Sequence, residues 1–261
     1  MLKDIQNRWE KLGQDFEAKP EAALEHAVTE LIKEGDVIFL TAFGAEGCVI
    51  FHMIAELVKS GKIPEPITEL EQLNQKSEQG RLAIVNLDTG YQFKETIELK
   101  DQLEEKYGLK VIMLEPKLSV AEQDAQYGKD LFKTDPDQCC YMRKLVPLAE
   151  LLDGRLAWIT SIRRDQSSHR ASAMAFEYDR KFKLGKINPL IKWSKSDIWK
   201  CIHENQIPYN LLLDQGYDSI GCEPCTSPGE GRKGRWAGKD KIECGLHIQE
   251  EEMEQGGEFT I

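Results

Sequence analysis

Seven cysteines supply the first candidate chemistry of this chain, and four of them form two close pairs. Cys139 and Cys140 are adjacent, and Cys225 follows Cys222 at the third position. Two such pairs suit one tetrahedral thiolate site, which holds zinc or an iron–sulfur cluster. Zinc sites usually separate paired ligands by about two to four residues, so the adjacent pair weighs against zinc without deciding for iron. The four could also be small buried core residues.

Two basic residues follow the adjacent cysteines. Arg143 and Lys144 lie one helical turn after Cys140. A cluster held by four thiolates is anionic, and cations at this spacing would offset its charge. On an exposed helix face the same two side chains would only be solvated.

Cys244 stands alone, in the segment ECGLH near the end of the chain. Arg232, Arg235, His247 and three lysines surround it in the sequence. Cationic surroundings lower the pKa of a thiol and produce a nucleophilic thiolate. We therefore expect Cys244 to be a nucleophile; the alternative is an incidental cysteine.

Two loops that follow apolar segments are candidates for anion binding. The small residues of Thr41–Gly47 precede a helical pattern, and amides at a helix N-terminus suit a phosphate, although such loops are often plain turns. This loop lacks the pattern SGGxDS, which argues against ATP-splitting chemistry. Arg163, Arg164 and Arg170 form a basic loop, which could bind a ligand or pair with acidic residues.

The elements that must position these residues alternate between strand and helix. Buried strands are predicted at 37–40, 82–87, 110–114 and 156–160. A surface helix is predicted within residues 1–34. Further helices are predicted to begin at about Cys48, to end at about Tyr107 and to run from Cys139 to Leu152. A last helix is predicted after Ser194, where Asp197 completes a capping-box-like pattern. Alternation of this kind indicates an α/β fold with a parallel sheet, whose ligands bind beyond the carboxyl ends of the strands.

Composition excludes several classes of protein. The chain has 261 residues, with 34 Lys and Arg against 45 Asp and Glu and a net charge of −11. This charge argues against general DNA binding and membrane-surface binding. No apolar stretch approaches the ~18 residues of a membrane span, and the first residues lack the apolar region of a signal peptide. We expect a cytoplasmic protein, in which an odd number of cysteines serves as ligands and nucleophiles.

Beyond Gly216 the apolar periodicity fails, and the glycine-rich remainder is predicted to be a long loop or lid. We therefore expect an α/β domain with an N-terminal helix over residues 1–225. Residues 226–261 would form a C-terminal segment that carries Cys244 and is not an independent domain.

Five sequence segments together resemble the iron–sulfur form of the assimilatory adenylyl-sulfate reductases. They belong to the wider family of adenylyl-sulfate (APS) and phosphoadenylyl-sulfate (PAPS) reductases. The segments are CCYMRKLVPL, WITSIRRDQSSHR, CEPCT, GRKGRW and KIECGLH. The likeness runs from about Val37 to His247, which is most of the chain.

The resemblance implies a Rossmann-like fold of the adenine nucleotide alpha hydrolase (PP-loop) type, with a mobile C-terminal catalytic segment. It also implies one [4Fe-4S] cluster, held by Cys139, Cys140, Cys222 and Cys225, with Lys144 between the cluster and the sulfate. Cys244 would attack. The substrate contacts would come from Thr41, Phe43 and Gly44 in the first loop, Asp88 and Gly90 on the adenosine side, Arg170 at the nucleotide, and Arg232, Arg235 and His247 at the phosphosulfate.

The activity implied by the resemblance is reduction of APS to sulfite and AMP through an enzyme S-sulfocysteine, in assimilatory sulfate reduction and cysteine biosynthesis. An external dithiol protein, thioredoxin or glutaredoxin, would supply the electrons. The partners would be this reductant and a small sulfonucleotide, with no nucleic acid and no membrane, and we expect a homo-oligomer.

Two alternatives stay open at the level of sequence. The loop TAFGAEG partly matches the loop of cluster-free PAPS reductases, and Ser161 replaces a glycine usual in the family. A PAPS reductase or a dual-specificity enzyme is therefore one alternative. The other is a zinc-dependent protein that binds or modifies RNA on the same fold.

Overall fold

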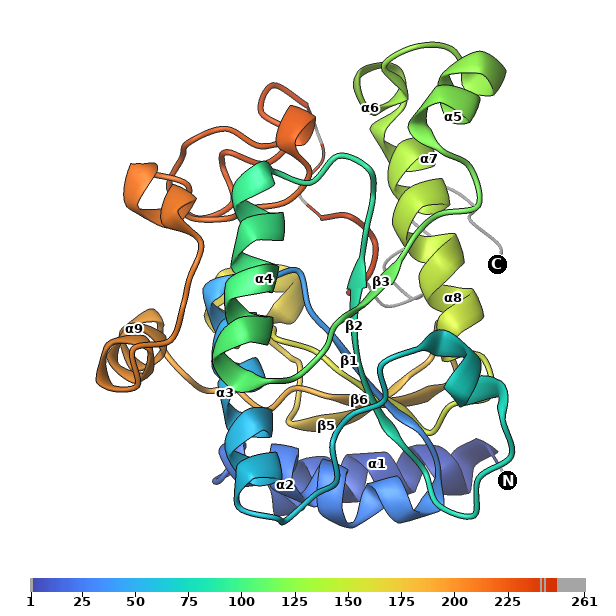
Figure 1. The fold of residues 1–261 in the computed structure, drawn as a ribbon, viewed down its shortest axis with the longest axis vertical. Helices are drawn as coiled ribbons and strands as arrows, with labels where there is room; N and C mark the ends of the chain where they lie inside the picture. The colour runs from blue at the N-terminus through green and yellow to red at the C-terminus, as the bar shows by residue number, and fades with distance from the viewer. Residues whose placement is uncertain (1, 240, 242, 248–261) are drawn as a thin grey trace.

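A six-stranded, mostly parallel sheet organises the computed structural model, which describes residues 2–239, 241 and 243–247 (Figure 1). The strands are β1 (Val37–Leu40), β2 (Leu82–Leu87), β3 (Ile112–Leu114), β4 (Ala157–Ile159), β5 (Phe176–Asp179) and β6 (Leu184–Ile187). Their order across the sheet is β3-β2-β1-β4-β6-β5. The predicted α/β class is therefore confirmed.

The order of the central strands creates a crevice at the carboxyl ends of the sheet. β1 pairs in parallel with β2 on one side, where Val37 is opposite Leu82, and with β4 on the other, where Val37 is opposite Ala157. The chain runs outward from β1 through β2 to β3 and then crosses to β4. Strand order thus reverses beside β1, and such a reversal leaves space for a ligand at the carboxyl ends.

Alternate residues of the strands pack on opposite faces of the sheet. Val37 and Phe39 of β1 belong to a core that includes residues of α2, α3, α4 and α9. Ile38 and Leu40 belong to a second core on the opposite face, which includes the leucines of α8. Figure 1 shows α3 and α4 on one side of the strands and α7 and α8 on the other.

Nine α-helices lie in the described part of the chain. They are α1 (Leu2–Asp15), α2 (Glu21–Thr29), α3 (Ala45–Lys59), α4 (Lys94–Tyr107), α5 (Val120–Tyr127), α6 (Leu131–Thr134), α7 (Pro136–Cys140), α8 (Val146–Leu152) and α9 (Lys195–Glu204). The predicted capping box of α9 is present, because the Ser194 side chain accepts from the Asp197 amide and the Asp197 carboxylate accepts from the Ser194 amide.

Three predicted helices differ from the structure. The N-terminal surface helix is two helices separated near Pro20, and α2 is not superficial, because Leu24 and Ala27 are fully buried. α3 begins three residues before the predicted Cys48. The predicted helix 139–152 begins at Pro136, where Asp135 accepts from the Gln138 amide at 2.9 Å, and contains a π-helical turn at Tyr141–Leu145.

The strand prediction was incomplete. β5 and β6 were missed, and β5 runs antiparallel to β6, so the sheet is not wholly parallel as predicted. Both strands interrupt their apolar residues with charged ones, in FEYD and LGKI. The charges are accommodated by pairing: Lys186, almost fully buried, donates to Glu177 at 2.8 Å.

None of the helices within the described ranges is long and apolar enough to cross a membrane.

Gly185 of β6 lets α1 approach the sheet. A Cβ atom at this position would lie 2.1 Å from the ring of Trp9, which is 3% exposed. We expect Gly185→Ala to lower the free energy of unfolding by about 1–3 kcal/mol, as overpacking does. Urea unfolding measures this change.

The matched control is Trp9→Leu, which removes the ring that the new methyl group meets. The double variant should lose less stability than the sum of the losses of the two single variants, because the smaller leucine side chain relieves the clash. Strict additivity would show that Gly185 is not needed for this contact.

Candidate functional site

A cavity of about 470 Å³ lies beyond the carboxyl ends of β1, β2 and β4, and we name it the strand-end cavity. On its wall, Leu40 ends β1 and Thr41 follows it, Leu87 ends β2 and Thr89 lies just beyond it, and Thr160 follows β4. Its size falls within the range of about 300–1,000 Å³ typical of small-molecule sites. The topology therefore places a ligand-sized space where the sequence predicted one.

Most of the predicted site residues lie on this wall, although segments far apart in the chain supply them. The ones that line it are Thr41, Gly44, Lys144, Arg170, Cys222, Arg232, Arg235, Cys244 and His247. The C-terminal segment thus lies against the body of the domain at the strand ends.

Phe43, Asp88 and Gly90 were predicted to touch substrate but do not line the strand-end cavity. Phe43 is buried in the core at 1% exposure, and its positive φ of 54° is held by its amide donating to Thr41 Oγ1. Asp88 Oδ1 accepts from the Gly90 amide at 2.9 Å, which closes a tight turn at residues 88–90. This turn lies beside one of the paired cysteines, because Thr89 Oγ1 contacts Cys222 Sγ.

The four paired cysteines line a second, smaller cavity, which we name the thiol cavity. Its wall consists of Cys139, Cys140, Cys222 and Cys225 with Tyr91, Phe132, Pro136, Arg143, Lys144, Arg235 and Trp236. Lys144, Cys222 and Arg235 line both cavities, so the two spaces adjoin.

Contacts with the turn after β2 bring the second cysteine pair to the first. Thr89 Oγ1 and Cys222 Sγ are 3.3 Å apart in a hydrogen bond, and the Glu223 amide donates to the Tyr91 carbonyl at 2.7 Å. On the other side, the Trp236 amide donates to the Cys225 carbonyl at 2.9 Å. Loop 222–225 is therefore fixed between the end of β2 and the C-terminal segment.

The π-helical turn directs two cations to different places. Arg143 is buried and donates to the Thr89 carbonyl and, at 3.0 Å, to Gln123 Oε1, so it holds the turn at residues 88–90. Lys144 makes no ion pair with any described carboxylate. Burial lowers its pKa, but the negative charge of Cys222, Cys140 and Cys244 in their thiolate forms outweighs burial and raises it. Its charge therefore persists where negative charge must be balanced.

The donor set suits a thiolate-bound metal group. Burial raises the pKa of Cys139 to about 11 and that of Cys140 to about 12, so a metal bound here would have to displace their protons. All seven cysteines are described and none forms a disulfide. No three Cys, His, Asp or Glu side chains within the described ranges are arranged to hold a single metal ion. The four thiols border an enclosed space instead of meeting at one point.

The environment of Cys244 favours its thiolate. Burial raises the pKa of this thiol, but the ammonium of Lys144, the Leu246 amide and the guanidinium of Arg235 outweigh burial and lower it. Glu243 opposes them with its negative charge. The net lowering supports the predicted nucleophilic character.

His247 differs from the predicted role of a cation. Its ring stacks on Trp158 with centroids 5.5 Å apart and an interplanar angle of 6°. Burial and the nearby Arg170, Lys186, Arg232 and Lys181 together lower its pKa well below the usual value. A neutral imidazole can donate a hydrogen bond from this position but brings no charge.

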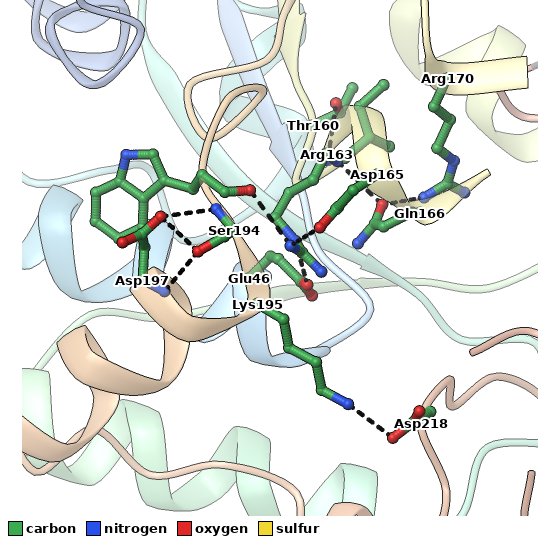
Figure 2. A network of polar contacts seen from close by, with 12 residues as sticks. Glu46, Thr160, Arg163, Asp165, Gln166, Arg170, Ser194, Lys195, Asp197 and Asp218 are labelled. Carbon is green, nitrogen blue, oxygen red and sulfur yellow. Dashed lines mark hydrogen bonds and ion pairs between the residues drawn. The ribbon is translucent and has the colours of Figure 1, made fainter. Parts of the chain in front are cut away.

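The basic loop after β4 mostly pairs with acids. Figure 2 shows Arg163 between Glu46 and Asp165, and the two contacts measure 2.9 and 2.7 Å. Arg164 pairs with Glu17 of the N-terminal region at 2.9 Å. The structural alternative thus holds for Arg163 and Arg164. Arg170 also pairs with an acid, Glu243, at 3.2 Å, and both Arg163 and Arg170 line the strand-end cavity.

Comparison with known proteins assigns the chain to a family. The family model "Phosphoadenosine phosphosulfate reductase domain" matches residues 36–228. This chain belongs to that family. A Geobacillus sp. (strain WCH70) protein named adenosine 5'-phosphosulfate reductase is 42% identical over 218 residues, which are 82% of this chain and 84% of the relative.

Two further relatives place the chain within this reductase family. Adenosine 5'-phosphosulfate reductase 2 of Bacillus subtilis (strain 168) is 42% identical over 81% of this chain and 83% of its own. The crystal structure of the PAPS reductase from Candida auris, a phosphate complex, has a TM-score of 0.66 at 27% identity. It covers 85% of this chain and 97% of that chain. The expected family membership is therefore confirmed.

One contact residue of the candidate site was not predicted from the sequence. Glu243 lies in ECGLH directly before Cys244, is 4% exposed, and accepts from both Arg170 and Arg232. The signal in the sequence that could have identified Glu243 is its position as an acidic residue within a mostly basic segment. Glu46, which pairs with Arg163, was missed in the same way, because its partner is distant in the chain.

The position of Lys144 leads to a test of the thiol chemistry. Removing a positive charge destabilises a thiolate, so Lys144→Gln should raise the pKa of Cys244. The rate of Cys244 alkylation by iodoacetamide, followed by mass spectrometry from pH 6 to 10, measures this pKa. An unchanged pH midpoint of alkylation would show that Lys144 does not lower the pKa of Cys244.

Proposed function

We propose that this protein reduces APS to sulfite and AMP through an S-sulfocysteine on Cys244, with electrons from thioredoxin or glutaredoxin. The observation that carries the proposal is the meeting of Cys244 with Lys144 at the junction of the two cavities. The names of the Geobacillus and Bacillus relatives support APS as the substrate. The seven free thiols fit the reducing cytoplasm, where we place the enzyme.

The nucleotide phosphate would bind at the N-terminus of α3. Gly44 is the N-cap of this helix, and no described side chain caps its first amides. Free amides at a helix N-terminus, aided by the helix dipole, favour an anion. Thr41 and Gly44 would therefore hold the phosphate through this loop.

In the first step the Cys244 thiolate attacks the sulfur of the sulfate group. A bond forms between Sγ and that sulfur, the bond from sulfur to the bridging oxygen breaks, and AMP leaves with the electron pair. Such transfers ask the protein for positioning and for cations near the spreading charge. Lys144 and Arg235 would supply the cations, since neither is paired with a described carboxylate.

In the second step a thiolate of the external dithiol attacks Sγ of Cys244. Sulfite leaves, a mixed disulfide forms, and the second thiol of the reductant resolves it, releasing Cys244 as a thiol. The dithiol is oxidised by two electrons, which balances the reduction of the sulfate group to sulfite.

Cys139, Cys140, Cys222 and Cys225 would hold the [4Fe-4S] cluster in the thiol cavity. Four thiols around an enclosed space suit a multinuclear cluster better than a single zinc ion. When bound, the cluster would supply structural support and a fixed negative charge. Lys144 separates this space from Cys244 and would hold the sulfate end of the substrate between them.

The preference for APS would come from the wall beside α3 and α9. The cations there already face carboxylates: Arg163 contacts Glu46 and Asp165, and Lys195 contacts Asp218 at 2.9 Å (Figure 2). PAPS has an additional phosphate group, which needs an available cation. Carboxylates at these positions would repel it.

Replacing the nucleophile tests the mechanism. Cys244→Ser should abolish sulfite formation from APS, because an unactivated hydroxyl is a far weaker nucleophile than a thiolate. AMP affinity, and the iron, sulfide and absorption spectrum of anaerobically purified protein, should stay at the wild-type level. Turnover retained by the variant would refute the role of Cys244; a colourless wild-type protein that contains zinc would refute the cluster.

Replacing Glu46 tests the substrate preference. Glu46→Gln removes one negative charge and a partner of Arg163, so the ratio of kcat/KM for PAPS to that for APS should rise about fivefold. Glu56→Gln is the matched control, because it changes an acid of the same helix that does not line the cavity. An equal ratio in both variants would contradict the assignment.

A further inference from the structure

The carboxylate of Glu243 occupies two arginines of the candidate site. Its Oε2 accepts from Arg232 Nη2 at 2.9 Å and from Arg170 Nη2 at 3.2 Å. Its Oε1 accepts from Ser167 Oγ at 3.3 Å. The side chain is 2% exposed, so this carboxylate is almost completely removed from water.

The contacts of Glu243 join two separate parts of the chain. Ser167 and Arg170 belong to the loop after β4, and Arg170 is also oriented by a hydrogen bond to Gln166 Oε1 (Figure 2). Arg232 belongs to the C-terminal segment itself. A buried carboxylate is stable only when it is paired and hydrogen-bonded, so withdrawing Glu243 from these partners would be costly.

Contacts on the other side of Cys244 complete the docking. Lys181 donates to the Gly245 carbonyl, and the side chain of Leu145 packs 3.5 Å from the Cβ position of Gly245. His247 stacks on Trp158 of β4. Cys244 thus lies between two anchored neighbours, and Glu243 is the only one of them held by paired charges within the described residues.

We infer that Glu243 is a positioning residue, which docks the C-terminal segment on Arg170 and Arg232 and thereby places Cys244 beside Lys144. This inference rests on the proposed function for the role of Cys244. It reassigns the two arginines: they anchor the nucleophile through Glu243, and Lys144 and Arg235 remain for the sulfate group.

Glu243→Gln tests this role, with Glu230→Gln as the matched control. Glu230 lies in the same segment and pairs with Lys233, and both side chains are more than 80% exposed. Hydrogen–deuterium exchange without nucleotide should be about tenfold faster in Glu243→Gln for peptides that include residues 243–247, because a charge-assisted contact is lost. The control should exchange like the wild type.

Single-turnover kinetics adds a readout that a general loss of structure would not reproduce. In Glu243→Gln, formation of S-sulfocysteine from APS should slow about tenfold, while AMP affinity stays within the range of the control. Glu243→Asp, which keeps the charge on a shorter side chain, should recover part of the rate.

Two outcomes would overturn the inference. One is unchanged exchange at residues 243–247 in Glu243→Gln. The other is tighter APS binding with an unchanged single-turnover rate, which would make Glu243 a competitor of the substrate. A wild-type protein that forms no sulfite from APS would instead refute the proposed function, and the exchange comparison would still decide whether Glu243 docks the segment.

Discussion

Lys144 lines both cavities, and the charge balance of the thiols around them depends on its ammonium group. Burial alone would lower its pKa, but Cys222, Cys140 and Cys244 raise it. In return, Lys144 lowers the pKa of Cys244 more than any other neighbour does. A single cation can serve both spaces only because the strand-end cavity and the thiol cavity adjoin.

The backbone around Lys144 is built for this position. Asp135 caps α7, Pro136 occupies its first turn, and the π-helical turn at Tyr141–Leu145 follows directly after the adjacent cysteines. A π-helical turn changes the direction of the side chains that follow, and such turns are frequent at functional sites. Here Arg143 supports the turn after β2, while Lys144 reaches the boundary of the two cavities.

Sequence patterns predicted the strongly apolar elements and failed where charge interrupts them. β1 and β2 were predicted with their observed bounds because every residue in them is buried. β5 and β6 were missed because Glu177 and Lys186 interrupt their apolar pattern, and only the ion pair between them makes the burial of Lys186 acceptable. The break near Pro20 and the early start of α7 follow from local residues, Pro20 and Asp135, which the apolar periodicity does not weigh.

The residue types and their spacing by themselves determined which chemical groups this chain carries: two thiol pairs, a lone cysteine among cations, and a loop of small residues after the first strand. The tertiary structure decided which of these residues act together. It places the turn at residues 88–90 beside the thiols, pairs Arg163 with Glu46, lowers the pKa of His247 and puts Glu243 on Arg170 and Arg232. The reason is physical: charge state and pairing depend on burial and on distances between segments that are far apart in the sequence, and only the folded chain sets these.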